Sequence, residues 1–467
     1  MRWRDIKESF LEFWHKFKQE KYGIIGVVFF GLFILLILCE SLIIPFPEAD
    51  SRWRDVTYWQ NNPKGAEPIW VNWFTSQDRA EHKILDSPKV LEKDRSKMKI
   101  MNLIFDYNYE DELPPKDLIF KALAKGNIMM SIELERPDGN KVQLSRISIN
   151  NSNEKEVVVS LNNKGSSTAY DFIKKYDTAE NIQSLSRDTI RPMNIFFSQV
   201  QEGMYVQPTP LKGTYKIKIS AIVMGKDSIL ENPSLTIAGR VFGLLGTDNS
   251  KRDIWSGIIA GVKWAMLLGL LTSCISVTIG VIYGVTSAYF GGWVDALIMR
   301  IFEIFTSIPL LPVLIVMSAI FKPSIWILMI MMSLFFWVGS VRTVRSIALQ
   351  IKEETYIEAA YALDASDSRI IFKHMISQVV PYSFASMALM VPSAIIYEAT
   401  ISLIGLGDAT IVTWGQILHG AMSSGAVLQG LWWWVIPPGI FIAMMGMTFA
   451  FLGFTMDTIL NPKLKKR

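Results

Sequence analysis

The chain has 467 residues, of which 50% are hydrophobic and 19% are charged, and its formal net charge is +4. An average soluble domain carries about 25% charged residues, so this composition indicates a membrane protein with a substantial polar part. The small net charge, with basic residues gathered at the two chain ends, argues against nucleic-acid binding. The two cysteines and four histidines show neither a disulfide framework nor metal-ligand spacing, so we expect no metal site and no catalytic site.

Six stretches are apolar and long enough to cross a bilayer, which takes about 20 residues in a helix. The first covers 22–44. Because its apolar run is longer than the core of a cleaved signal peptide, we interpret it as an uncleaved anchor. The other five cover 264–283, 301–321, 325–341, 382–404 and 431–452. The stretch 325–341 is short, and its helix could run past Arg342.

The distribution of basic residues predicts the orientation in the membrane. Lysine and arginine are enriched in the N-terminal tail, in the loop after the fourth span and in the C-terminal tail, whereas the loop 405–430 has none. Because basic flanks stay in the cytoplasm, we expect both termini inside and the region after the first span outside the cell membrane. The expected segments are a cytoplasmic 1–21, a first helix 22–45, an extracytoplasmic domain 46–245, a five-helix core 246–460 and a basic tail 461–467.

The region between the first and second spans is polar and contains no spanning run. Segments with β-type patterning alternate with turn signals, such as Pro137-Asp138-Gly139-Asn140. Strands are expected at 99–107, 127–135, 141–149, 156–161, 213–224 and 234–242, and a short helix at about 171–176. This pattern suggests an antiparallel β-sandwich. The domain is either an elaborated loop without chemistry of its own or a docking site for a solute receptor.

Three charged residues, Lys263, Glu303 and Glu398, lie within or at the margins of the spans, where charge is costly and marks functional candidates. For Lys263 and Glu303 we favour snorkelling or pairing near the interface. Glu398 lies deeper, and it either faces a translocation path or makes a structural bond between helices. The run 432–434 of three tryptophans is expected to form an interfacial aromatic belt. Three glycines of the second span are expected to permit close helix packing: Gly269, Gly280 and Gly284.

The most informative cytoplasmic segment is 350–380. It contains two helical pieces, 356–363 and 367–376, separated by Asp364-Ala365-Ser366-Asp367. Asp and Ser are good N-cap residues, because their side-chain oxygens accept hydrogen bonds from free backbone N–H groups, and Asp also tolerates a left-handed turn. The segment therefore predicts a helix, a tight turn and a second helix. That shape suits insertion into a groove on a partner, with an ordinary solvated loop as the alternative.

This segment resembles the coupling loop of ABC importer permeases, whose pattern is Glu-Ala-Ala, three residues, Gly, nine residues, then hydrophobic-x-Leu-Pro. The chain matches at Glu358-Ala359-Ala360 and at the hydrophobic Ile376. It departs at Asp364, where Gly is usual, at Ser377, where Pro is usual, and at the first of the two hydrophobic positions, His374. The resemblance assigns ATPase coupling to Glu358, Ala359, Ala360, Asp364, Ser366 and Ile376.

Further motifs follow in the same order as in one subfamily. They are Gly246-Thr247-Asp248-Asn249-Ser250-Lys251-Arg252-Asp253 (with Lys251 where Gly is usual), Tyr289-Phe290-Gly291-Gly292-Trp293-Val294-Asp295, Met299-Arg300, Leu403-Ile404-Gly405-Leu406-Gly407 and Trp414-Gly415. Together they resemble the C-type permease subunit of dipeptide, oligopeptide and nickel importers. The resemblance covers the first span and 241–467, and most of 46–240 lies outside it.

The resemblance implies an all-α polytopic permease that forms half of the translocation pathway of an ATP-driven importer. Peptides are the implied cargo, with oligosaccharides or nickel chelates as alternatives. The implied partners are a second permease, two ATPase subunits that bind ATP and Mg²⁺, and an extracytoplasmic solute-binding protein. The chain lacks the phosphate-loop pattern G-x-x-x-x-G-K-[ST], so we expect no enzyme activity and no cofactor of its own. A membrane-anchored receptor or sensor is the hypothesis from another class, and a secondary transporter, which usually shows internal repeats, is a third.

Overall fold

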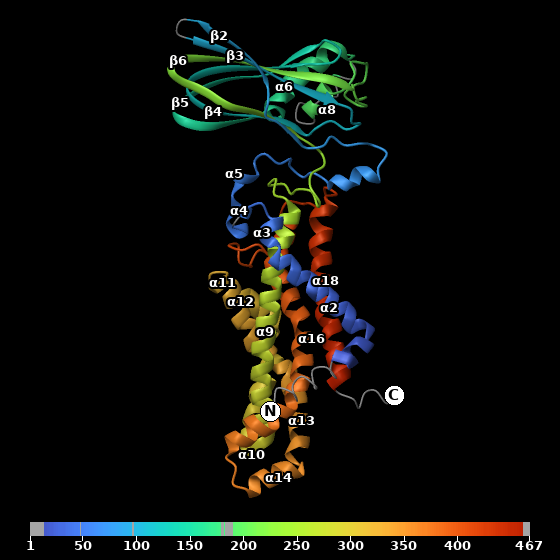
Figure 1. The fold of residues 1–467 in the computed structure, drawn as a ribbon, viewed down its shortest axis with the longest axis vertical. Coiled ribbons are helices and arrows are strands. Elements are labelled where there is room, and N and C mark those ends of the chain that lie inside the picture. The colour runs from blue at the N-terminus through green and yellow to red at the C-terminus, as the bar shows by residue number, and fades with distance from the viewer. Residues whose placement is uncertain (1–13, 47, 96–97, 179–181, 183–189, 461–467) are drawn as a thin grey trace. The chain divides into compact units, whose positions relative to one another are not determined.

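The computed structural model describes residues 14–46, 48–95, 98–178, 182 and 190–460 (Figure 1). The chain forms two compact units. One is helical and joins the chain up to Arg54 with the chain from Ser256 onward, and the other is β-rich and covers Asp55–Trp255. We describe each unit by itself.

The helical unit begins with α2 (Lys21–Leu38), α3 (Glu40–Ile43) and α4 (Ala49–Arg54). Its later helices are α9 (Ile254–Phe290), α10 (Gly292–Ser307), α11 (Leu310–Ile320), α12 (Ile325–Phe336), α13 (Val338–Lys352), α14 (Thr355–Ala362), α15 (Asp367–Arg369), α16 (Ile376–Leu403), α17 (Trp414–Ser423) and α18 (Trp432–Leu460). The first two residues of α9 belong to the β-rich unit. In the described part of the chain, five helical segments are long and apolar enough to cross a membrane. They are Lys21–Leu38, Ile254–Phe290, Ile325–Lys352, Asp367–Leu403 and Trp432–Ile459.

The expected third span is a bent pair of helices rather than one straight helix. α10 and α11 meet at 78°, and counting them as one broken span brings the total to six. The break lies at Ile308, which is extended (φ −88°, ψ 122°) and directly precedes Pro309. A proline disfavours the helical conformation of the residue before it and lacks the N–H that a helix would need, so the bend is a local consequence of Pro309.

The second helical piece of the segment 350–380 and the fifth expected span are one continuous helical run. α15 passes through a π-helical stretch, Ile370–Met375, directly into α16. A π turn widens the hydrogen-bond ladder without ending the helix. Pro381 lies inside α16 and does not end it either. α15 and α16 therefore belong to one uninterrupted helical segment, Asp367–Leu403.

Close packing at the three expected glycines is confirmed. A Cβ built at Gly280 would lie 2.0 Å from Ser340 Oγ, and one at Gly284 would lie 2.7 Å from a methyl of Val344. One at Gly269 would lie 2.6 Å from a methyl of Val391. α9 therefore touches α13 and α16 at positions where only a hydrogen side chain fits.

The aromatic-belt expectation is wrong for two of the three tryptophans. Trp433 and Trp434 are buried inside the protein, and Trp432 is partly exposed. Indole rings pack well in a helical core, because their large apolar faces fill space between helices. A tryptophan run at a helix start therefore does not by itself distinguish a lipid-facing belt from a packed core.

The β-rich unit is built on one antiparallel sheet. Its strands are β1 (Lys83–Leu85), β2 (Lys89–Arg95), β3 (Met98–Tyr109), β4 (Asp117–Glu135), β5 (Lys141–Ser160) and β6 (Gly213–Ala238). They are ordered β2-β3-β6-β4-β5, with β1 also paired to β6. The unit also contains α5 (Val56–Trp59), the 3₁₀ helix η1 (Ile69–Trp73), α6 (Leu161–Tyr176) and α8 (Pro192–Phe196). α6 packs against β5, β4 and α8.

The β-sandwich expectation is wrong, because the expected strands join into fewer and longer ones. The segments 141–149 and 156–161 are one strand, β5, and 213–224 with most of 234–242 are another, β6. These long strands curve into a half-barrel whose concave side encloses the apolar core (Figure 1). Register shifts in β4 near Gly126 accompany the curvature, as β-bulges do.

Candidate functional site

The helix α14 is short, with one face anchored and the other exposed. Ile357 is buried and packs in an apolar cluster with Val285 of α9, Val344 of α13 and Ile371 of the π-helical stretch. This contact fixes the helix against three membrane helices. The exposed residues of α14 and its C-cap include Glu358, Ala359, Tyr361 and Leu363, with the last two 63% and 83% exposed. A pair of large apolar side chains beside a carboxylate gives this face the composition of a small docking surface.

The turn after α14 is a Schellman motif with Asp364 in the left-handed region at φ 57°. The N–H of Ala365 donates to the carbonyl of Ala360 at 3.1 Å, and the N–H of Asp364 donates to the carbonyl of Tyr361 at 3.0 Å. These two bonds satisfy carbonyls that the helix end would otherwise leave free. The expected turn at Asp364 is therefore present, and Asp364 stands where glycine is usual in this motif.

The expected capping of the second helix is wrong. Ser366 occupies the N-cap position of α15, but its side chain makes no capping hydrogen bond within the described chain. Its hydroxyl instead lies 3.4 Å from that of Ser368. The side chain of Asp364 likewise makes no hydrogen bond with a described residue, so backbone bonds alone hold the turn.

A tyrosine at the end of α9 fixes the start of the second helix. Tyr289 Oη donates to Asp367 Oδ1 at 2.6 Å, and Lys352 Nζ at the end of α13 donates to the carbonyl of Tyr289 at 2.8 Å. Three helix ends therefore meet beside α14. From the sequence, Tyr289 could be identified only as a residue of a family motif. Its hydrogen bond to Asp367 could not be predicted, because the two residues are 78 positions apart.

The remainder of that motif forms an ion pair between helices. Asp295 of α10 accepts two hydrogen bonds from Arg345 of α13, at 2.7 and 2.5 Å, and another from Ser287. The turn between α9 and α10 requires two glycines, since Gly291 and Gly292 have φ of 62° and 51°. The glycines thus make the sharp reversal that brings Asp295 to Arg345.

The predicted coupling residues do not all share one surface. Those from Glu358 to Ser366 lie together on α14 and its turn. Ile376 begins α16, is partly buried and packs against the same apolar cluster as Ile357. Ile376 therefore packs beneath α14 as part of its apolar support and is not part of the exposed face.

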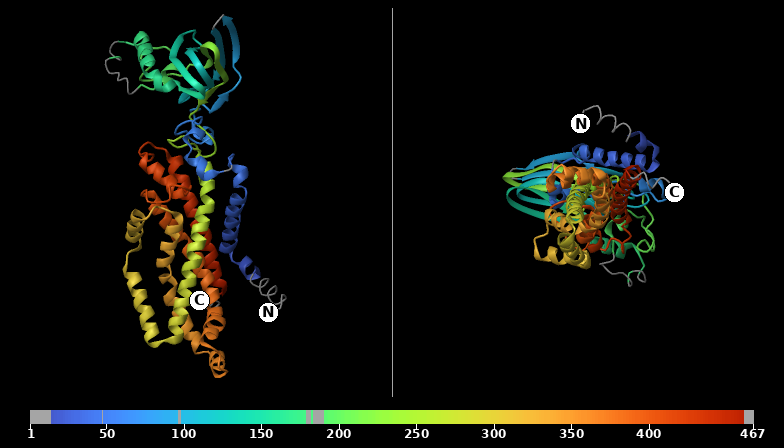
Figure 2. Two further views of the ribbon diagram at one scale, coloured as in Figure 1. Left: turned by 90° about the vertical axis from the view of Figure 1, so that its left-hand side faces the viewer. Right: turned by 90° about the horizontal axis from the view of Figure 1, so that it is seen from below.

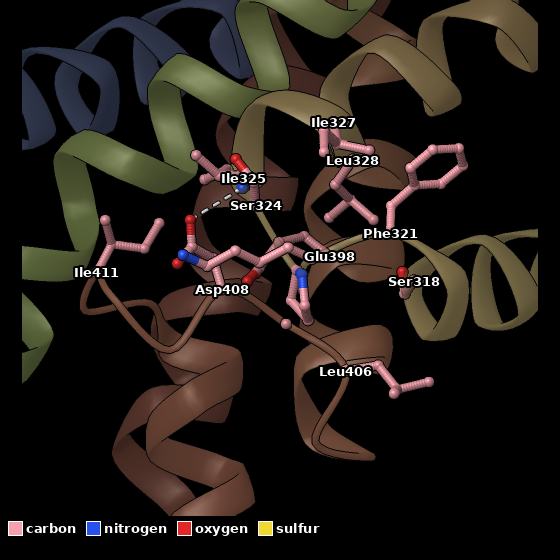
Figure 3. A pocket seen from close by; sticks show the side chains of 13 residues that line it. Ser318, Phe321, Ser324, Ile325, Ile327, Leu328, Glu398, Leu406, Asp408 and Ile411 are labelled. Atoms are coloured by element: carbon pink, nitrogen blue, oxygen red, sulfur yellow. Dashed lines mark hydrogen bonds between the residues drawn. The ribbon is translucent and has the colours of Figure 1, made fainter.

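Glu398 is a buried carboxylate on α16. Its Oε1 accepts a hydrogen bond from Ser402 at 2.7 Å. It lines a pocket of about 10 Å³, which is room for about one water molecule. Figure 3 shows Glu398 facing the start of α12 and the loop from Leu406 to Ile411.

The glycine motifs that follow α16 surround the partner of Glu398. A Cβ built at Gly407 would lie 1.9 Å from Ser402 Oγ, and one at Gly415 would lie 2.6 Å from Ser402 Cβ. Gly405 has φ 86°, which turns the chain directly after the helix. These motifs therefore hold the loop and α17 closely against the hydroxyl that bonds Glu398.

The other two charged residues at span margins are paired. Lys263 Nζ lies 2.7 Å from Glu40 and 3.8 Å from Asp50. Glu303 pairs with Arg300 of the same helix at 2.8 Å. The pairing interpretation of Lys263 and Glu303 is confirmed, and it fits the high cost of unpaired charge in a membrane.

These features define a helical polytopic membrane protein whose motif residues converge on an exposed loop between helices. The family described as binding-protein-dependent transport system inner membrane component matches residues 276–466. The dipeptide transport system permease protein of Bacillus subtilis is 32% identical over 222 residues, which is 47% of this chain and 69% of that protein. The oligopeptide transport system permease protein of Haemophilus influenzae is 34% identical over 223 residues, 48% of this chain and 71% of that protein.

The chain therefore belongs to the family of inner membrane permease subunits of ABC peptide importers, as its motifs indicated. This is a family of transport permeases and not of enzymes. Among solved structures, TmCBM61 in complex with beta-1,4-galactotriose covers 36% of this chain and 93% of its own at 10% identity. Its TM-score of 0.16 is too low to carry an argument.

Proposed function

We propose that this chain is one of two permease subunits of an importer for di- or oligopeptides and that α14 couples it to an ATPase subunit. The observation that carries the proposal is the exposed face of α14, with Glu358 beside Tyr361 and Leu363, on a helix whose other face is fixed by Ile357. A docking helix needs both a free face and a rigid support. ATP and Mg²⁺ belong to the two ATPase subunits in this proposal, and a solute-binding protein delivers the cargo.

The proposed topology has six spans, with the bent pair α10–α11 counted as one. Both termini and α14 are cytoplasmic, and the β-rich unit is extracytoplasmic. The support is the excess of Lys and Arg in both tails and around α13, against the loop 405–430, which has none. An extracytoplasmic β-rich unit is then placed where it can meet the solute-binding protein.

The proposed mechanism is a rigid-body switch. When the ATPase subunits close on ATP, α14 moves with them. The bond from Tyr289 to Asp367 and the buried Ile357 transmit this movement to α9 and to the continuous helical run that leads into α16. The spans then rock between outward-facing and inward-facing states.

For Glu398 we propose the structural role. The carboxylate bonds Ser402 of its own helix, and Gly407 and Gly415 of the following chain pack closely on Ser402, so this pair holds α16 to the chain that follows. The adjacent pocket is too small for a peptide. A place on the translocation path would require α12 and the loop from Leu406 to Ile411 to separate during transport.

The experiment that tests coupling is the charge reversal Glu358→Lys. Because a like-charge or unpaired contact at an interface costs several kcal/mol, we expect peptide uptake and ATPase co-purification to fall by about tenfold or more while membrane insertion persists. The control is Glu353→Lys, which reverses another exposed carboxylate five positions earlier. Normal uptake by Glu358→Lys, or equal loss in both variants, would contradict coupling through α14.

The cargo is tested with the same preparation. Uptake of labelled dipeptides and longer peptides is compared with uptake of oligosaccharides and nickel chelates. The names of the related permeases favour peptides. Uptake of a sugar or a nickel chelate but of no peptide would leave the permease assignment in place and overturn the cargo.

A further inference from the structure

A groove beside α2 has a polar compartment that continues into an apolar one. The polar compartment has a volume of about 620 Å³ and is lined by Glu40, Glu48, Asp50, Arg54 and Lys263 among others. The apolar compartment has a volume of about 590 Å³ and follows α9 along Trp264, Leu267, Leu270 and Leu271. Ile37 and Lys263 line both compartments, so the two form one amphipathic groove.

The groove lies at the depth where a bilayer changes from hydrocarbon to headgroups. The apolar run of α2 ends at Leu38, and Glu40 in the polar compartment comes two residues later. On α9, Lys263 lines the polar compartment while Leu267 and Leu271, one and two turns further on, line the apolar one. Figure 2 shows α2 in blue and α9 in yellow-green in its left-hand view. Each half of the groove thus matches the layer of the bilayer beside it.

Some of the charged side chains in the polar compartment form ion pairs with one another, and others do not. Lys263 is paired with Glu40 and lies near Asp50, and Asp50 also accepts hydrogen bonds from the N–H of Val412 and from Trp264. By contrast, Arg54 is exposed and its guanidinium forms no ion pair with a described carboxylate, since its Nε donates only to the backbone carbonyl of Asp50, at 3.5 Å. Glu48 is exposed too, with only Ser51 donating to its carboxylate among the described side chains. One cation and one carboxylate therefore remain open at the same rim.

We propose that this groove binds a zwitterionic phospholipid that carries a primary ammonium group. Arg54 would bind the phosphate, which its planar guanidinium fits well. Glu48 would bind the ammonium, and an acyl chain would lie along Leu267 and Leu271. The lining holds three carboxylates (Glu40, Glu48, Asp50) against two cations (Arg54, Lys263). This excess of negative charge disfavours a lipid whose headgroup is only anionic.

The bound lipid has a structural consequence for α2. This helix packs against α18, and the groove lies on its side toward α9. A lipid in the groove covers apolar side chains of α9 and Ile37 of α2 with its acyl chain, and its headgroup binds at α4 and the residue before it. The lipid therefore joins the segment that carries Asp50 to α9 and to Ile37 at the end of α2.

The test uses the intact importer, purified in mild detergent from membranes that contain both phosphatidylethanolamine and phosphatidylglycerol. Retained phospholipid is extracted and counted per permease chain by mass spectrometry. The variant Leu267→Trp fills the apolar compartment, and Ile282→Trp is the matched control on the same helix. The two side chains are similarly exposed, at 39% and 37%, and Ile282 lines neither compartment. Arg54→Ala removes the proposed phosphate contact.

We expect phosphatidylethanolamine to be enriched over phosphatidylglycerol relative to the membrane. Its retention should fall by about tenfold in Leu267→Trp and clearly in Arg54→Ala, and stay unchanged in Ile282→Trp. Equal retention in all variants, or preference for phosphatidylglycerol, would overturn the proposal. Loss of the second permease from Leu267→Trp without a change in lipid would also overturn it, because the groove would then hold a protein helix.

Discussion

The helical unit and the β-rich unit differ in how far they bury basic side chains. The interhelix ion pairs Asp295–Arg345 and Lys263–Glu40 have side chains that are 18–32% exposed, so solvent or headgroups reach them. The β-rich unit instead encloses Arg136 completely, with a side-chain exposure of 0%. The interior of a membrane helix has no spare backbone groups to satisfy a buried cation, because its carbonyls already bond within the helix. A unit rich in strands and loops has such groups, and it can bury a cation at lower cost.

Arg136 shows how that burial is compensated. Its guanidinium bonds the carboxylate of Asp138 at 2.9 Å and the carbonyls of Ile195 and Ser198 at 3.3 and 2.5 Å. It also lies over the ring of Phe172, 4.9 Å from the ring centre. The cation thus joins the end of β4 to α6 and α8, which are far from it in the sequence.

The largest expected effect comes from breaking this site. Arg136→Met should destabilise the β-rich unit by about 3–5 kcal/mol, because Asp138 and two buried carbonyls lose their partner. The control is Lys218→Met, which removes an ion pair with Glu135 on the solvated face of the sheet and should cost at most about 1 kcal/mol. Hydrogen exchange of β4 and β6 amides in the full-length protein measures both. Similar losses of protection in the two variants would show that burial of the charge does not matter.

The second effect concerns His82, whose ring lies edge-on to the ring of Phe242, with 5.2 Å between the two ring centres. Burial, assisted by the positive charge of Lys251, lowers the pKa of His82 from 6.5 to about 4. Because the folded state resists protonation, the unfolded chain binds the proton first. Above pH 6.5, neutral His82 therefore does not lower the free energy of unfolding of the β-rich unit. As the pH falls from 6.5 to about 4, protonation of His82 in the unfolded chain lowers this free energy. The loss amounts to about 3 kcal/mol.

The measurement is the difference between the wild type and His82→Gln, since burial also raises the pKa of Asp111 and Asp117 in the same unit. Unfolding of the β-rich unit in the full-length protein is followed from pH 7 to pH 4 by hydrogen exchange. The variant should lack the slope that His82 adds between pH 6.5 and 4. Parallel pH dependences in the two proteins would mean that His82 protonates freely in the folded state.

The sequence predicts the helical unit better than the β-rich unit, for a physical reason. Long apolar runs report membrane spans almost directly, since lipid requires them. Strand ends are reported only by weak turn preferences, which neighbouring strands override. The run Asn150-Asn151-Ser152-Asn153 looks like a turn, yet it lies inside β5, where Asn151 pairs with Gly126 of β4. The predicted strands 141–149 and 156–161 are therefore parts of one strand, β5.

The candidate site divides in the same way. Asp364 could be predicted, because its turn is a local property of residues that tolerate positive φ. The bonds from Tyr289 to Asp367 and from Arg345 to Asp295 could not, because they join residues 78 and 50 positions apart. Ile376 matched the family pattern, but the pattern does not state that its role is burial. Local conformation is thus readable from one sequence, and long-range pairing is not.

The smallest expected effect compares the two positions where this chain replaces a glycine of the family pattern. Asp364 in the helical unit and Lys251 in the β-rich unit both keep positive φ, at 57° and 66°. A non-glycine residue pays about 1–2 kcal/mol for this conformation, so glycine should relieve strain at both. The side chains differ, however. Asp364 has no side-chain hydrogen bond with a described residue, whereas Lys251 Nζ donates to the carbonyl of Gln60 at 2.9 Å.

We therefore expect Asp364→Gly to be neutral or stabilising by up to about 1 kcal/mol, with uptake unchanged. Lys251→Gly gains the same relief but loses a charge-assisted bond worth about 1.5–3 kcal/mol, so it should be neutral to destabilising. Valine should be harmful at both positions, because its branched Cβ disfavours positive φ. Local hydrogen exchange of α14 with its turn, and of residues 246–254, reports the two sites separately. If Asp364→Val is harmless and Asp364→Gly loosens α14, residue 364 is an ordinary helical position and the Schellman turn is wrong.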